Sequence, residues 1–218
     1  MKALPLSIFV GIVIGGSVLI VLRSRNETPL RPVSQSPSAS PEARNGQRSA
    51  ASTNTLTANL PTLPVRGTKI VISKRARSLK LYSSGRLLRT YHVGLGFSPV
   101  NDKVNEGDGA TPEGSFYIFT KNSESAYFLS LGISYPNSAD ATRGLRDGLI
   151  TKEQYEQIVA ANRARGTPPQ DTPLGGQIYI HGNGSYKDWT WGCVALNDKD
   201  VLELFNAVSV GTPVIIRH

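Results

Sequence analysis

Short runs of alternating apolar and polar residues follow one another along the chain from Val65 to the C-terminus. This spacing places every second side chain on one face and is typical of strands that are buried on one side. A polar Ser-Ser-Gly-Arg turn at 83–86 separates the second run from the third. The predicted strands are Lys69–Ser73, Ser78–Tyr82, Leu87–Val93, Ser115–Thr120, Tyr127–Ser134, Gln177–Ile180 and Pro213–Arg217.

Two segments show helical features instead. Thr151 to Gln154 form a capping-box pattern, and good helix formers follow as far as Arg165. A second helix begins with Asn197 as its N-cap and ends at Gly211. Its apolar face comprises Val201, Leu202, Leu204, Phe205 and Val208. The pattern as a whole predicts a mainly β fold with a few packed helices.

The N-terminal part of the chain has a different character. Leu4–Leu22 is an uncharged run of 19 residues, nearly long enough as a helix to cross the ~30 Å core of a bilayer. We interpret residues 1–25 as a retained membrane anchor, with a cleaved signal peptide as the alternative. Residues 26–64 are rich in Ser, Pro and Thr and predict a flexible linker. Residues 65–218 then form a folded domain outside the cytoplasmic membrane.

The basic charge of the chain is spread out rather than concentrated. Of 24 basic and 16 acidic side chains, residues 1–64 hold six and two, which leaves 18 and 14 for residues 65–218. No dense stripe of Lys and Arg is present, so nucleic-acid binding is poorly supported. A weakly basic domain is suited to anionic surfaces such as a cell wall or lipid headgroups.

Candidate chemistry is concentrated between Ile178 and Asn197. Cys193 is the only cysteine, which excludes an internal disulfide and argues against a cysteine-based zinc site. A predicted strand ends at His181, and Gly182 allows a sharp turn there. Lone cysteines are usually inert and lone histidines usually structural. A thiol needs a nearby base to become a nucleophile, however, and this pair lies close together in a glycine-rich segment.

Other residues are weaker candidates for a functional role. The amides of Trp191, Gly192 and Cys193 are candidate oxyanion donors, each worth about 3 kcal/mol in a true oxyanion hole. His92 lies inside a strand pattern and His218 is the last residue, so neither is a strong candidate base. Turn chemistry is the simpler interpretation of the acidic residues Asp108, Glu113 and Asp188, with contact to a substrate as the alternative. The two tryptophans suit packing or the wall of a cleft.

These motifs together resemble the L,D-transpeptidase catalytic domain of the YkuD type, in its murein-associated branch. The resemblance runs from about residue 68 to 217 and rests on four segments. They are His181-Gly182 with Gly192–Leu196, the Thr-Pro-x-Gly motif within Gly107–Gly114, Leu131–Asn137, and Trp189–Cys193. One departure is Trp191, which stands where many members carry a second histidine.

The resemblance implies a β-rich catalytic fold that needs no cofactor and no metal. Cys193 would attack an amide of a peptidoglycan stem peptide, with His181 as general base and the Gly182 carbonyl orienting its ring. Gly192 and Trp191 would supply oxyanion amides, while Trp189 and Thr190 would contact the substrate. Transfer of the acyl group to an amine makes the protein an L,D-transpeptidase. Transfer to water makes it an L,D-carboxypeptidase or cross-link hydrolase, and a non-catalytic wall-binding module is the third interpretation.

Overall fold

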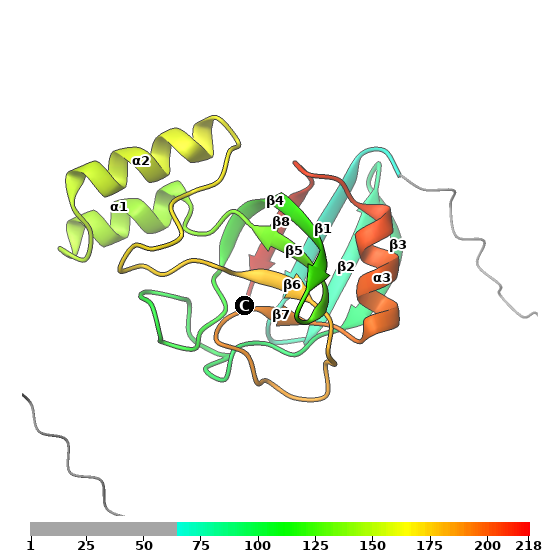
Figure 1. Ribbon diagram of the computed structural model, residues 1–218. Helices are drawn as coiled ribbons and strands as arrows, with labels where there is room; N and C mark the ends of the chain where they lie inside the picture. The colour runs from blue at the N-terminus through cyan, green and yellow to red at the C-terminus, as the bar shows by residue number, and fades with distance from the viewer. Residues whose placement is uncertain (1–64) are drawn as a thin grey trace, which may run out of the picture. The chain divides into compact units, whose positions relative to one another are not determined.

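The computed structural model describes residues 65–218, so the predicted anchor at 1–25 and linker at 26–64 lie outside the described residues. Eight strands and three helices make up this part of the chain (Figure 1). The strands are β1 (Thr68–Ser73), β2 (Ser78–Ser83), β3 (Arg86–His92), β4 (Gly114–Ser125), β5 (Phe128–Ile133), β6 (Tyr179–His181), β7 (Val194–Ala195) and β8 (Pro213–Arg217). The helices are α1 (Ser138–Arg146), α2 (Lys152–Arg163) and α3 (Asp198–Ala207).

All eight strands belong to one sheet with the order β3-β2-β1-β8-β4-β5-β6-β7. β1 pairs with β2 so that Ile70 faces Leu81 and Ile72 faces Leu79, and all four side chains are buried. The alternation in the sequence therefore places one apolar face of the sheet on the core, as the pattern predicted. The predicted β-rich fold with a few helices is confirmed.

Some boundaries differ from the predicted ones. β4 continues to Ser125, five residues beyond the predicted end, because its polar second half pairs with β5 in a hairpin. β6 begins at Tyr179 rather than Gln177, whose positive φ of 54° takes it out of the strand. The two-residue strand β7 is too short for any alternation to show in the sequence. Within residues 65–218, no helix is both long and apolar enough to span a bilayer.

A helical insertion lies between β5 and β6 and contains α1 and α2. Thr151 caps α2 through the predicted capping box with Gln154. α1 was missed, although Asn137 and Asp140 form a capping box of their own. Leu145 is the only large apolar residue of α1, so few apolar positions mark this helix in the sequence. Ala141, Ile150, Ile158 and Leu174 form a small core between the two helices, separate from the core of the sheet.

Helix α3 packs on the sheet and directly follows the Cys193 segment in the chain. Val201 and Leu204 are buried as predicted, and Phe205 packs against the core. The prediction was wrong for Leu202, which is 44% exposed, because it lies one residue off the buried stripe. The helix also ends at Ala207 rather than Gly211, since Val208 is extended with φ −113° and ψ 157°.

Truncation of the buried face of α3 gives a test with a matched control on the same helix. Leu204→Ala should lower the free energy of unfolding by about 2–5 kcal/mol, because it leaves a cavity in the core. Leu202→Ala removes the same atoms from a solvent-exposed position and should change stability by less than about 0.5 kcal/mol. Urea denaturation followed by circular dichroism measures both. Equal stabilities of the two variants would show that α3 does not pack as described.

Candidate active site

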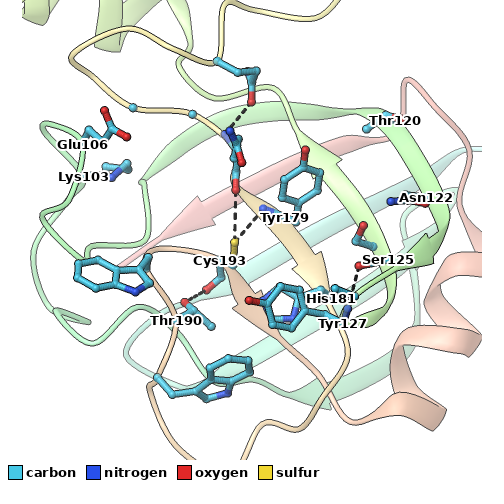
Figure 2. A pocket seen from close by; sticks show the side chains of 18 of the residues that line it. Lys103, Glu106, Thr120, Asn122, Ser125, Tyr127, Tyr179, His181, Thr190 and Cys193 are labelled. Atoms are coloured by element: carbon cyan, nitrogen blue, oxygen red, sulfur yellow. Dashed lines mark hydrogen bonds between the residues drawn. The ribbon is translucent and has the colours of Figure 1, made fainter. Parts of the chain in front are cut away.

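A cavity of about 1040 Å³ opens beside β4, β5 and β6, and residues of these three strands line it. The β4–β5 hairpin forms one wall, the loop around Lys103–Gly107 and the strand-free segment 170–177 form another, and the 189–193 loop closes it. His181 and Cys193 both line this cavity, so the structure brings the predicted nucleophile and base to one place (Figure 2).

The pairing of β6 with β7 explains how the two residues come together. These strands run parallel, with Ile180 opposite Val194 and His181 opposite Ala195. Side chains alternate along a strand, so Ile180 and Val194 point into the core, and Tyr179, His181 and Cys193 point the other way. The Tyr179 amide accordingly donates to Cys193 Sγ at 3.4 Å. A parallel pair of short strands thus carries the site.

The tautomer of His181 follows from its hydrogen bond. Nδ1 lies 2.8 Å from the carbonyl oxygen of Gly182, and a carbonyl accepts hydrogen bonds only, so Nδ1 carries the proton. Nε2 then has a free lone pair with which to accept a proton. Burial lowers the pKa of His181, while the hydrogen bond to Gly182 opposes this shift in part. The ring is therefore neutral near pH 7, which is the form that a general base requires.

Cys193 is a protonated thiol in the resting site. Burial raises its pKa to about 11, although the Tyr179 amide and the charge of Lys103 act in the opposite direction. The thiol donates to the carbonyl oxygen of Gln177 at 3.5 Å. Because thiol and imidazole are both neutral at rest, the sulfur could act as a nucleophile only by giving up its proton to a base.

The Thr190 side chain makes two hydrogen bonds to the backbone at Gly192 and Cys193. Its hydroxyl donates to the Cys193 carbonyl at 2.8 Å and accepts from the Gly192 amide at 3.2 Å. The Gly192 amide is thus already engaged, whereas the Trp191 and Cys193 amides make none of the hydrogen bonds found within residues 65–218. Gly192 adopts φ +122°, and a Cβ there would lie 2.7 Å from the Ala110 carbonyl, so only glycine fits.

Removing the hydroxyl of Thr190 should loosen the Cys193 segment. Thr190→Val keeps the shape of the side chain but loses both hydrogen bonds, and a displaced nucleophile should lower kcat about 10- to 100-fold. Thr190→Ser keeps the hydroxyl and should retain most activity. Steady-state kinetics on muropeptides compares the two variants. A valine variant with a higher KM and an unchanged kcat would instead assign Thr190 to substrate contact, as the sequence predicted.

The two tryptophans have different neighbours in the cavity wall. Trp189 donates from Nε1 to the Gly184 carbonyl at 3.1 Å and presents its ring to His181, with ring centroids 5.6 Å apart. Trp191 is 69% exposed at the rim of the cavity and rests edge-on against Phe97, with centroids 4.7 Å apart. Both side chains line the cavity, so both are in reach of a bound substrate.

The acidic residues near the motifs have structural roles in the fold. Asp108 accepts hydrogen bonds from the amides of Val104, Asn105 and Ala110 and from Lys103, as expected of turn chemistry. Glu113 pairs with Lys74, a fully buried cation. Asp188 pairs with Arg77 at 2.7 Å and accepts from the Leu95 amide at 2.9 Å. None of the three acidic residues lines the cavity.

The cavity-wall side chains that sequence reasoning missed include Lys103, Tyr127, Gln177 and Tyr179. Tyr179 was within reach of the sequence, because it lies two residues before His181 on the same strand and so shares its face. Gln177 lies in the same predicted strand, but its positive φ takes it out of β6. Lys103 and Tyr127 come from segments far from the Cys193 motif, and no spacing connects them to it. His92 and His218 do not line the cavity, which agrees with the prediction that neither is a strong candidate base.

Most of the described part of the chain matches a known protein family. A family model for the L,D-transpeptidase catalytic domain, YkuD, matches residues 67–216. No curated protein sequence matches the chain.

Several solved structures resemble the fold. An L,D-transpeptidase from Mycobacterium smegmatis is 14% identical, with a TM-score of 0.41 over 70% of this chain and 59% of that chain. The helical cell shape determining protein Pgp2 from Campylobacter jejuni is 19% identical, with a TM-score of 0.48 over 71% and 48%. Bd1075 from Bdellovibrio bacteriovorus is 20% identical, with a TM-score of 0.44 over 70% and 48%. The matched region thus spans roughly half of each of these longer chains.

Proposed function

Because the chain belongs to the YkuD family of L,D-transpeptidase catalytic domains, we propose that it is a peptidoglycan L,D-transpeptidase working through a cysteine acyl-enzyme. The observation that carries this proposal is the geometry of one residue pair. His181 and Cys193 project from neighbouring parallel strands into the same cavity, with Nε2 of His181 free to accept a proton. The substrate class, a peptidoglycan stem peptide, comes from the family.

The first half of the reaction forms a thioester. Cys193 Sγ attacks the carbonyl carbon of the donor amide, and the thiol proton passes to His181 Nε2. The resulting oxyanion lies against free backbone amides, of which those of Trp191 and Cys193 are the candidates. The tetrahedral intermediate then collapses, its C–N bond breaks, and the imidazolium returns the proton to the departing amine.

The second half releases the acyl group. An acceptor amine attacks the thioester carbonyl and gives a proton to His181 Nε2, and the C–S bond breaks. The sulfur leaves as a thiolate and takes that proton back, so the site returns to its neutral pair. Water in place of the amine gives hydrolysis by the same steps. The transpeptidase and the hydrolase thus share the nucleophile and differ only in the acceptor.

Incubation of the full-length protein with defined muropeptides tests this proposal. Mass spectrometry of the products separates the outcomes, because transfer gives a joined peptide and hydrolysis gives a shortened one. Transfer as the main product supports the transpeptidase. A shortened peptide as the main product would assign the hydrolase instead, and binding without any product would leave a non-catalytic wall-binding module.

The location of the protein is a proposal as well. The uncharged Leu4–Leu22 run motivates an anchor in the cytoplasmic membrane, with residues 26–218 outside it. Protease added to spheroplasts should then cut within residues 26–64 and release the folded domain. Full protection of the domain would contradict this topology. A soluble mature protein that begins near residue 26 would contradict the anchor but not the export.

A further inference from the structure

The tip of the β4–β5 hairpin lies directly over the catalytic histidine. Tyr127 and His181 have ring centroids 4.6 Å apart and a tilt of 34° between their planes, which is close to stacking. Trp189 covers a second side of the imidazole, edge-on. Figure 2 shows the Tyr127 ring in front of His181, at the cavity end opposite Lys103. As a result His181 is only 3% exposed, whereas Tyr127 is 45% exposed and separates the imidazole from solvent.

Backbone contacts hold the hairpin tip in this place. The Gly182 amide donates to the Tyr127 carbonyl at 3.0 Å, and the Tyr127 amide donates to Ser125 Oγ at 3.1 Å. The close approach needs a glycine at 182, because a Cβ there would lie 2.8 Å from the Tyr127 carbonyl oxygen. Phe128 adopts φ +69°, which is costly for a residue with a side chain. The backbone position of Tyr127, from which its ring packs on His181, is therefore built into the fold.

From these contacts we infer that Tyr127 is a positioning residue, whose ring keeps His181 neutral and in register with Cys193 by excluding water from the imidazole. The inference rests on the proposed function and adds to it a residue outside the Cys193 motif. Tyr127 itself donates no proton in the reaction. It acts through His181, and what matters is the ring rather than the phenol hydroxyl.

Two effects of an aromatic ring on a neighbouring imidazole oppose each other. The ring removes water, which disfavours the charged form, while its π face attracts a cation and favours it. His181 is buried, and burial lowers its pKa, so we expect the exclusion of water to be the larger effect here. Truncation of Tyr127 should therefore raise the pKa of His181. A dominant cation–π attraction would give the opposite sign.

The other groups around His181 stay unchanged by that truncation. Tyr179 and Cys193 share its face of the sheet, Ser130 of β5 lies opposite it, and Asp198 of α3 accepts from the Asn183 amide at 2.8 Å. Lys121 of β4 lines the same cavity, but its ammonium donates to the carbonyls of Phe205 and Val208. A change in the titration of His181 in a Tyr127 variant thus reports on the ring itself.

The test is an NMR titration of the full-length protein purified in detergent, with its three histidines labelled at Cε1. Comparison with a His181→Gln variant identifies the signal of His181. In the wild type its midpoint should lie below the ordinary value of about 6.5. Tyr127→Ala should move the midpoint of His181 up toward that value. If alanine impairs folding, Tyr127→Asn serves as a second truncation. Tyr127→Phe keeps the ring and should match the wild type. Tyr186→Ala, which removes an exposed tyrosine outside the cavity wall, is the control.

Kinetics on muropeptides gives the second readout. Tyr127→Ala should lower kcat at least about 10-fold and shift the acid limb of its pH profile upward, whereas Tyr127→Phe restores both. An unchanged or lower His181 midpoint in Tyr127→Ala would overturn the inference, and so would a rise in KM alone. The midpoint does not depend on turnover. A wild type without transferase activity would therefore refute the proposed function and leave the role of Tyr127 to be judged by the titration.

Discussion

Replacing Cys193 with alanine should abolish both acyl transfer and hydrolysis, which is the largest effect expected of any single substitution here. Cys193 is the only cysteine of the chain, and its sulfur faces the cavity beside Tyr179 and His181. The variant should fold as well as the wild type, because the side chain is only half-buried and the substitution removes a single sulfur atom. Product formation from muropeptides, followed by mass spectrometry, should fall to the background rate.

Two further measurements separate loss of the nucleophile from other damage. Cys193→Ser should be nearly inactive, because a hydroxyl ionises much less readily than a thiol. The wild type should gain the mass of one acyl group from a reactive donor such as a carbapenem β-lactam, on the peptide that contains Cys193. Wild-type turnover by the alanine variant would refute the acyl-enzyme and leave only the fold and the family.

Replacing His181 with alanine should lower kcat/KM by about 10²–10⁴-fold through loss of general-base assistance. The thiol remains but has no partner to take its proton, and with a pKa raised by burial to about 11 it is barely ionised at neutral pH. His92→Ala is the matched control, since His92 lies at the exposed end of β3 and does not line the cavity. Equal losses in the two variants would contradict the role assigned to His181.

The pH dependence of kcat/KM should differ between the wild type and His181→Ala, because different groups titrate in the two proteins. His181 must be neutral to act as a base, so wild-type kcat/KM should fall only as the pH drops through its lowered pKa. In His181→Ala the thiol ionises unaided, and the residual rate should rise with pH above neutrality, because burial raises the pKa of Cys193. A flat alkaline profile in the variant would show that thiol ionisation does not limit it.

The strands of the sheet were readable in the sequence because each has one buried face. Alternation at Ile70, Ile72, Leu79 and Leu81 determines which side chains enter the core, and a slip of one residue would expose them all. Cys193 and His181 were also visible, since a lone cysteine near a strand-ending histidine is a local pattern. Elements without such a pattern escaped, as α1 did with its few apolar residues and β7 with its two.

Tertiary structure alone decided the environment of that pair. Parallel pairing of β6 with β7 turns Cys193 and His181 to one side, and the hairpin tip at Tyr127 comes from a segment more than 50 residues earlier in the chain. The hydrogen bond from the Thr190 hydroxyl to the Cys193 carbonyl likewise exists only because the loop at residues 189–193 folds back on itself. The sequence therefore determined which groups are candidates for catalysis, through their chemical type and local spacing. Their protonation states depend on burial and on contacts between distant segments, which no local pattern encodes.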